Sequence, residues 1–257
     1  MTSKNCSGRP WVVVTGAASG IGRAVANRCT ADGYRVLAID RNEDGLYRLV
    51  DDTDSQMAPL TADLCDPEIG ETVVQGLRSA HQKFSNGSED PKLKGVINVA
   101  GVSQGDSIDG ITDDDWHHSM DVNATAPMRL VRALLPLFVP EEDPAIVNIA
   151  SPVAIVGARK VSYAASKGAL LGLNAALTRN LSPEGIRVNA ILPGATITGM
   201  TDDWPEEKRQ AIAAQSPLDR LCRPEDIAGP VSFLLSDDAA YITGTVLNVT
   251  GGSKMGV

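Results

Sequence analysis

Cysteine, histidine and aromatic residues are scarce in this chain, and their pattern excludes several classes of protein. The four cysteines are Cys6, Cys29, Cys65 and Cys222, and the three histidines are His81, His117 and His118. The cysteines form no C-x-x-C pair, which argues against a disulfide framework or a zinc site. The histidines lack metal-ligand spacing, so we expect no metal. Scattered reduced thiols fit a cytoplasmic protein.

Membrane segments and basic clusters are missing as well. No run of eighteen apolar residues occurs, and residues 1–10 are polar, without the apolar segment of a signal peptide. The formal net charge of −9 argues against sequence-independent binding to nucleic acid or to an anionic membrane. We therefore expect a small-molecule substrate, with neither nucleic acid nor membrane as a partner.

Strand and helix signals alternate along the whole chain. Predicted strands cover 11–14, 35–40, 56–62, 95–99, 145–150, 187–192 and 245–249. Predicted helices run from Ile21 to a stop at Gly33 and over 43–50, 67–83, 112–138, 162–181, 205–214 and 223–235. The alternation predicts a single α/β domain over 1–257, a Rossmann-like doubly wound parallel sheet of about seven strands with helices on both faces.

A glycine-rich turn follows the first predicted strand. Thr15 to Gly22 reads T-G-x-x-x-G-x-G, with the next predicted helix starting inside it. A strand, a glycine turn and a helix start leave unpaired amide groups aimed outward, and these groups attract phosphate. The stretch therefore predicts a dinucleotide site, although a glycine turn alone also fits a connection that binds nothing.

The second predicted strand ends in Asp40. A carboxylate at this place accepts hydrogen bonds from ribose hydroxyls and repels a 2′-phosphate, which favours NAD over NADP. The following Arg41 could instead pair with that phosphate. We expect NAD as the preferred cofactor.

Tyr163 and Lys167 are four residues apart on a predicted helix, so they share one face. A tyrosine has a pKa near ~10 in water, and a charge at ~4 Å is worth roughly 4 kcal/mol, about three pKa units. The spacing therefore predicts that Lys167 lowers the pKa of Tyr163 into the range of a base. Ser151 ends the preceding strand, where its hydroxyl can hold a substrate oxygen. By itself the Y-x-x-x-K spacing also fits a packed tyrosine and a solvated lysine.

Together these motifs resemble the short-chain dehydrogenase/reductase family over nearly the whole chain. The stretches that carry the resemblance are Thr15 to Gly22, Asp63-Leu64, Asn98 to Gly101, Asn123, Asn148 to Ser151, Tyr163 to Lys167, Pro193-Gly194 with Thr198, and Tyr241 to Gly244. The family often has a second asparagine where this chain has Val99.

The resemblance implies a role for each matching residue. The implied catalytic residues are Asn123, Ser151, Tyr163 and Lys167, with Tyr163 as general acid/base, Ser151 polarising the substrate, Lys167 binding the nicotinamide ribose and Asn123 kinking its helix and holding a relay water. The implied cofactor-binding residues are Gly16, Ser19, Gly20, Ile21, Gly22, Asp40, Arg41, Asp63, Leu64, Asn98, Ala100, Gly101, Tyr163, Lys167, Pro193, Gly194, Thr196 and Thr198.

These features predict an NAD-dependent oxidoreductase that interconverts a secondary alcohol and a ketone. One alternative is an NADPH-dependent reductase of 3-oxoacyl thioesters, and a second is a non-catalytic dinucleotide-sensing protein. Polyols, sugars, hydroxy acids and alicyclic alcohols all remain possible substrates. Residues 195–216 are expected to form a lid, and the resemblance implies a homodimer or homotetramer.

Overall fold

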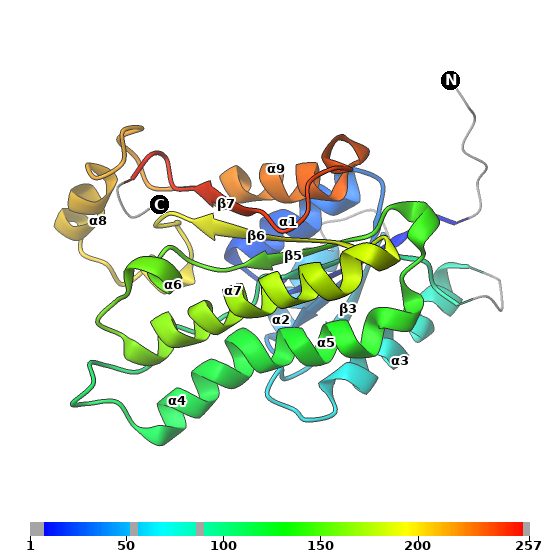
Figure 1. The fold of residues 1–257 in the computed structure, drawn as a ribbon, viewed down its shortest axis with the longest axis horizontal. Coiled ribbons are helices and arrows are strands. Elements are labelled where there is room, and N and C mark those ends of the chain that lie inside the picture. Colours follow the sequence, from blue (N-terminus) through cyan, green and yellow to red (C-terminus); the bar gives the residue numbers. More distant parts are fainter. Residues whose placement is uncertain (1–7, 52–55, 86–89, 254–257) are drawn as a thin grey trace.

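Seven parallel strands form one sheet in the order β3-β2-β1-β4-β5-β6-β7 (Figure 1). The computed structural model describes residues 8–51, 56–85 and 90–253. The strands are β1 (Trp11–Thr15), β2 (Arg35–Asp40), β3 (Met57–Thr61), β4 (Leu93–Asn98), β5 (Ala145–Ile149), β6 (Arg187–Pro193) and β7 (Val246–Val249). The strand order reverses between β1 and β4, which confirms the predicted doubly wound sheet and opens a crevice at the carboxyl ends of these strands.

Helices cover both faces of this sheet (Figure 1). They are α1 (Gly20–Ala31), α2 (Glu43–Asp51), α3 (Ile69–Phe84), α4 (Asp113–Met120), α5 (Ala126–Leu134), α6 (Val153–Val156), α7 (Val161–Leu181), α8 (Glu206–Ala213) and α9 (Pro224–Leu235). One apolar cluster joins α1, α2 and α9 to the sheet, and a second joins α3, α5 and the end of α7 to the other face.

The central strands are buried on both sides, and their side chains alternate between the two clusters. In β1, Val12 and Val14 belong to the α1–α9 cluster, whereas Trp11 and Val13 belong to the α3–α5 cluster. A strand places successive side chains on opposite faces, so a continuous apolar run is what a sheet covered on both faces requires.

The prediction of one continuous helix over 112–138 is wrong, because the structure divides this segment into two helices. It begins as expected with a capping box, in which the Thr112 hydroxyl accepts a hydrogen bond from the Asp115 amide. A π-helical turn over Asp121–Thr125 then separates α4 from α5, and a 3₁₀ turn ends the segment. The extra residue of a π turn breaks the helical register, and this turn contains Asn123.

The fourth strand starts two residues earlier than predicted, at Leu93 instead of Gly95. Leu93 pairs with Trp11 of β1 and bridges to Phe138. These partners are distant in sequence, whereas the local pattern of residues 84–94, which are mostly polar and contain proline and glycine, predicts a surface loop. Part of that predicted loop, 86–89, lies outside the described residues.

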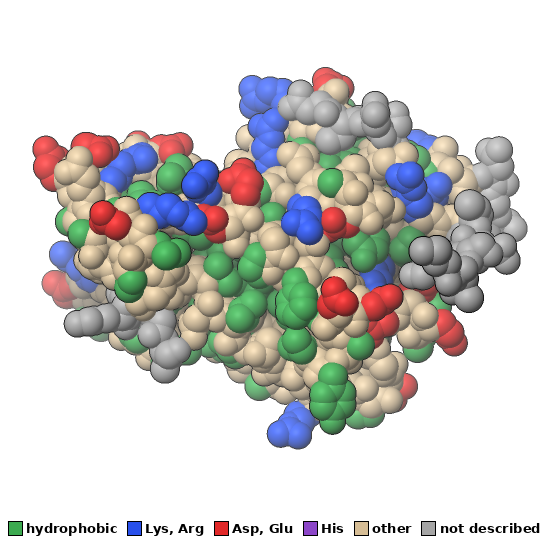
Figure 2. Space-filling view, turned by 90° about the horizontal axis from the view of Figure 1, so that it is seen from above, with side chains coloured by type: hydrophobic (Ala, Val, Ile, Leu, Met, Phe, Trp, Pro, Cys, Tyr) green, Lys and Arg blue, Asp and Glu red, His purple; other side chains and the backbone are tan. Residues whose placement is uncertain are grey.

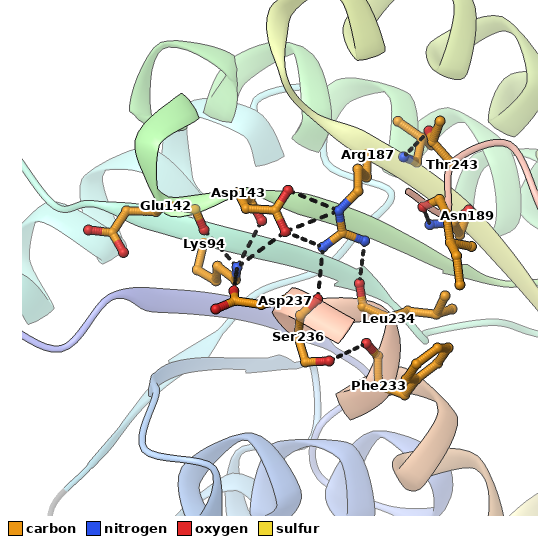
Figure 3. A network of polar contacts seen from close by, with 12 residues as sticks. Lys94, Glu142, Asp143, Arg187, Asn189, Phe233, Leu234, Ser236, Asp237 and Thr243 are labelled. Atoms are coloured by element: carbon orange, nitrogen blue, oxygen red, sulfur yellow. Dashed lines mark hydrogen bonds and ion pairs between the residues drawn. The ribbon is translucent and has the colours of Figure 1, made fainter. Parts of the chain in front are cut away.

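Charged side chains tie the amino ends of β4, β5 and β6 together, at the edge of the sheet opposite the crevice (Figure 3). The guanidinium of Arg187 donates to the Asp143 carboxylate at 2.9 Å and to the Leu234 carbonyl at 2.7 Å. The Lys94 ammonium donates to the backbone carbonyls of Glu142 and Asp143. Both cations are at least 95 % buried, so the network joins three strands and α9 through charges that are shielded from solvent on the cationic side.

Two features of the structure are relevant to binding a protein partner or a membrane. The face shown in Figure 2 carries apolar side chains over β7 and α9, where Phe233, Tyr241 and Val246 are exposed. Within the described residues, no helix combines the length and the apolar character needed to cross a bilayer.

Candidate active site

Two connected cavities open at the carboxyl ends of the strands. The first, the glycine-turn cavity, has a volume of about 360 Å³, and the second, the Tyr163 cavity, has a volume of about 760 Å³. Ile21, Val99, Gly101, Thr198 and Met200 line both, so the two form one continuous space.

Most of the sequence-predicted site residues line this space. Those in the glycine-turn cavity are Gly16, Ser19, Gly20, Ile21, Gly22, Asp40, Arg41, Asp63, Leu64, Ala100, Gly101 and Thr198. Those in the Tyr163 cavity are Ile21, Gly101, Ser151, Tyr163, Lys167, Pro193, Gly194, Thr196 and Thr198. Asn98 and Asn123 line neither cavity.

The glycine turn has the shape of an anion cradle. Gly20 has a φ of +50°, and a Cβ there would lie 2.9 Å from the Thr198 methyl group, so only glycine fits. A Cβ at Gly22 would lie 2.0 Å from the Gly16 carbonyl oxygen. Ser19 caps α1 without a side-chain hydrogen bond to the helix, which leaves its hydroxyl beside the first amides of α1. A phosphate group fits these donors and the positive end of the helix.

Asp40 is held rigidly at the end of β2. One oxygen of its carboxylate accepts a hydrogen bond from the Ala18 amide at 3.1 Å, and the other accepts from the Asn42 amide at 3.0 Å. Each carboxylate oxygen keeps a further lone pair for a ligand hydroxyl. Arg41 lines the same cavity, so one carboxylate and one guanidinium flank this end of it.

The side chains of Ser151 and Tyr163 meet in the Tyr163 cavity. Burial raises the pKa of Tyr163 above its ordinary value, and a hydrogen bond with the Ser151 side chain opposes that rise. The expectation that Lys167 lowers the pKa of this phenol is therefore not what the structure shows. Desolvation disfavours the phenolate more than the hydrogen bond favours it, so the phenol is the stable form.

Lys167 is buried beside this pair. Its ammonium donates a hydrogen bond of 2.8 Å to the carbonyl of Ile149, the last residue of β5. Burial lowers the pKa of Lys167 to about 8. A Cβ at Gly101 would lie 3.1 Å from the Lys167 ammonium and 3.0 Å from the Asn123 amide oxygen, so a glycine at this position lets both groups approach.

Asn123 lies behind the cavity wall. Its side-chain amide donates to the Val102 carbonyl and to the Ser166 hydroxyl, and its amide oxygen accepts from the Val102 amide. The side chain thus fixes the strand-to-helix connection after Gly101 against α7, next to Lys167. The distortion of its helix that the resemblance implied is present as the π turn.

Asn98 is also buried, and it lines neither of the two cavities. Its amide nitrogen donates to Asn148 at 2.8 Å, and the Asn148 amide donates to Asn174 on α7 at 3.0 Å. The amide oxygen of Asn98 has no partner among the described residues. Asn98 therefore anchors the strands from within.

Several lining residues were not predicted from the sequence. His118 and Val122 line the glycine-turn cavity, and the basic residues Arg159, Lys160, Lys208 and Arg220 line the Tyr163 cavity. No motif marks these positions, because they come from a helix face and from connections of irregular structure. In the part of the chain that is described, no three histidine, cysteine or acidic side chains gather as a metal ion would need, and the absence of a metal stays a prediction.

A family profile described as enoyl-(acyl carrier protein) reductase matches residues 16–254. The 3-oxoacyl-[acyl-carrier-protein] reductase FabG of Salmonella typhimurium is 33% identical over 244 residues, which cover 95% of this chain and 96% of that protein. The chain belongs to the short-chain dehydrogenase/reductase family. The family assignment makes the protein an oxidoreductase, as the resemblance implied.

Solved structures agree with this family assignment. The angucycline C-6 ketoreductase LanV with bound NADP has a TM-score of 0.86 at 27% identity, and the match covers 96% of both chains. The 3-ketoacyl-(acyl-carrier-protein) reductase of Brucella melitensis complexed with NADH has a TM-score of 0.84 at 28% identity, covering 95% of this chain and 97% of that one. Family members with this architecture thus bind a nicotinamide dinucleotide in either form.

Proposed function

We propose that this protein reduces the ketone of a 3-oxoacyl thioester to a secondary alcohol and also catalyses the reverse oxidation. The observation that carries the proposal is that Ser151, Tyr163 and Lys167 meet in one large cavity at the carboxyl edge of the sheet. The 3-oxoacyl reductase relatives support this substrate over the broader class of secondary alcohols. The dinucleotide-sensing alternative is less well supported, because a sensor has no need of these three side chains in one cavity.

The two hydroxyls hold and protonate the substrate oxygen. Ser151 donates a hydrogen bond to the carbonyl oxygen and so polarises it. Tyr163, which is stable as a phenol, donates its proton to that oxygen as the alcohol forms. Lys167 lines the same cavity one helical turn beyond Tyr163 and would bind the nicotinamide ribose, and in oxidation Tyr163 takes the proton back.

The residues of the glycine-turn cavity fit a nicotinamide dinucleotide. Gly16, Ser19, Gly20 and Ile21 would hold its phosphates and adjacent ribose, and Asp63 and Leu64 would contact its adenine. When bound, this group supplies the hydride for the carbonyl carbon. Pro193, Gly194, Thr196 and Thr198 line the space next to Tyr163 and would hold its nicotinamide end, with residues 195–216 acting as a lid.

We propose NAD(H) as the preferred form. The Asp40 carboxylate is fixed by two backbone amides, so it cannot turn away from a 2′-phosphate without losing both hydrogen bonds. The relatives leave this choice open, because one solved structure holds NADP and another holds NADH. Arg41 is the residue through which NADP(H) would be accepted.

Replacing Tyr163 by phenylalanine tests the proposed chemistry. The Tyr163→Phe variant should bind NADH as tightly as the wild type while losing most of its turnover, about a hundredfold or more, because only the proton donor is removed. Binding is read by quenching of NADH fluorescence and turnover by NADH absorbance with a 3-oxoacyl thioester. Turnover within a fewfold of the wild type would contradict the assignment.

A further inference from the structure

Besides Lys167, four basic side chains line the Tyr163 cavity of an otherwise acidic protein. They are Arg159, Lys160, Lys208 and Arg220. Among the described residues that line this cavity, the one carboxylate is Asp226, and the net charge of the chain is −9. The cavity thus concentrates positive charge against the overall charge of the molecule.

Acidic neighbours neutralise only part of this charge. Arg220 forms a two-pronged ion pair with Asp226, and Arg159 lies 3.4 Å from the Asp106 carboxylate. Both cations are thereby compensated, the second only weakly because Arg159 and Asp106 are exposed.

The other two cations contact neutral groups. The Lys160 ammonium donates to the Ser103 carbonyl at 2.7 Å, and the Lys208 ammonium lies 4.2 Å from the centre of the Trp204 ring. A carbonyl and an aromatic face orient an ammonium group without cancelling its charge. Lys160 precedes α7 and Lys208 belongs to α8, so the two charges come from different walls of the cavity.

The acids that neighbour Lys208 in the sequence lie outside the lining of the cavity. Asp202, Asp203, Glu206 and Glu207 are exposed, and none of them is a lining residue. α8 lies beyond the carboxyl ends of β6 and β7 (Figure 1), where a substrate would pass on its way to Tyr163.

Apolar side chains make up much of the remaining wall of the cavity. Met200, Trp204, Ile212 and Leu218 line it, and Ile155 and Val156 are exposed on the neighbouring α6. An apolar wall does not satisfy the hydroxyls of a sugar or polyol, whereas it packs well against an acyl chain.

We propose that Lys160 and Lys208 form an anion-binding subsite, so that the substrate has an apolar oxoacyl part and an anionic group at its other end. The proposal rests on the proposed function and names the form of the thioester. It places a phosphate of the thioester's carrier group between the two ammonium groups while the oxoacyl chain extends to Ser151 and Tyr163.

Three thioesters of the same 3-oxoacyl group separate the possibilities. The N-acetylcysteamine thioester is neutral, the 4′-phosphopantetheine thioester adds one phosphate, and the coenzyme A thioester adds the nucleotide phosphates. The proposal expects kcat/KM to rise by about tenfold or more from the neutral to an anionic thioester, mainly through KM, and to lose this gain at high ionic strength. A rise in kcat/KM already with the 4′-phosphopantetheine thioester assigns the subsite to that phosphate, and a rise only with the coenzyme A thioester assigns it to the nucleotide phosphates.

The variant Lys208→Met removes the charge and keeps the alkyl chain over Trp204. It should lower the ratio of anionic to neutral kcat/KM by about three- to tenfold. Lys160→Gln should act in the same direction. Lys83→Met, on the exposed end of α3 and outside both cavities, is the matched control and should leave the ratio unchanged.

Calorimetry provides a readout independent of turnover. Coenzyme A without an acyl group should bind the wild-type protein more tightly than the Lys208→Met variant. The subsite would be overturned if the ratio of anionic to neutral kcat/KM were the same in the wild type, Lys208→Met and Lys160→Gln. If all three thioesters were nevertheless reduced, the proposed function would stand. No reduction of any thioester by a protein that binds NADH would overturn the proposed function itself.

Discussion

The side-chain amide of Asn148 donates a hydrogen bond of 3.0 Å to the amide oxygen of Asn174, and this bond ties the middle of α7 to β5. Asn174 follows Lys167 by seven residues and therefore lies on the same face of the helix, two turns further along. Lys167 contacts the Ile149 carbonyl, and Tyr163 contacts the Ser151 side chain. Three polar contacts thus align α7 along the end of β5.

Removing the Asn174 amide should disturb this alignment. Asn174→Leu leaves the buried Asn148 amide without an acceptor, at a cost of about 1–3 kcal/mol, and shifts Tyr163 relative to Ser151. We expect kcat to fall by about tenfold with a smaller change in KM. Steady-state kinetics and thermal unfolding measure both effects. Asn180→Ala, an exposed asparagine on the same helix, is the control and should leave kcat as it is.

Asp40 should decide the choice of cofactor. The wild type should show a higher kcat/KM with NADH than with NADPH. Asp40→Ala should lower the NADH value by about tenfold or more, because a hydrogen bond to a charged acceptor is lost, and should raise the NADPH value. Arg41→Ala should lower the NADPH value alone. A wild type that prefers NADPH would refute the assignment of NAD(H).

The buried Lys167 should make stability depend on pH in a defined direction. Its folded-state pKa of about 8 lies below its ordinary value of 10.5. Below pH 8 the lysine is charged in both states, so the full cost of burying the charge, about 3 kcal/mol, opposes folding. Between pH 8 and 10.5 the folded protein loses the proton first, and the cost disappears.

Lys167→Met isolates this contribution. The free energy of unfolding of the variant, minus that of the wild type, should decrease by about 3 kcal/mol between pH 8 and 10.5. The buried Cys29 and the half-buried Tyr34, whose pKa values are both raised to about 12, act in the opposite direction in both proteins and cancel in the difference. Urea titrations at each pH give the two curves. A difference independent of pH would contradict the lowered pKa.

The ion pair at the amino ends of the strands should contribute more to stability than a surface pair. Asp143→Asn leaves the guanidinium of the buried Arg187 without its carboxylate, and asparagine retains the left-handed backbone at a φ of 47°. We expect a loss of about 3 kcal/mol in the free energy of unfolding. Asp90→Asn, which breaks the exposed pair with Arg78, should cost less than about 1 kcal/mol. Chemical denaturation of both variants provides the comparison.

Local sequence patterns predicted most of the scaffold and much of the cavity lining. The apolar run before Thr15, the glycines from Gly16 to Gly22 and the spacing of Tyr163 and Lys167 express rules that operate within a few residues. These rules predicted whether each segment is a helix or a strand, and they predicted that the site residues lie at the carboxyl edge of the sheet. The π turn at Asn123 was foreseen only as a kink, because it depends on the fit of Asn123 against Val102 and Ser166.

The sequence by itself determined a parallel α/β sheet, a glycine turn suited to phosphate and a tyrosine–lysine face, since short-range hydrogen bonding and side-chain period suffice for these. Only the tertiary structure decided that Asn98 anchors strands instead of lining the cofactor cavity, and that burial raises the pKa of Tyr163. It also decided that Lys160 and Lys208 share a cavity. Such properties depend on which distant segments pack together and on how much water they exclude.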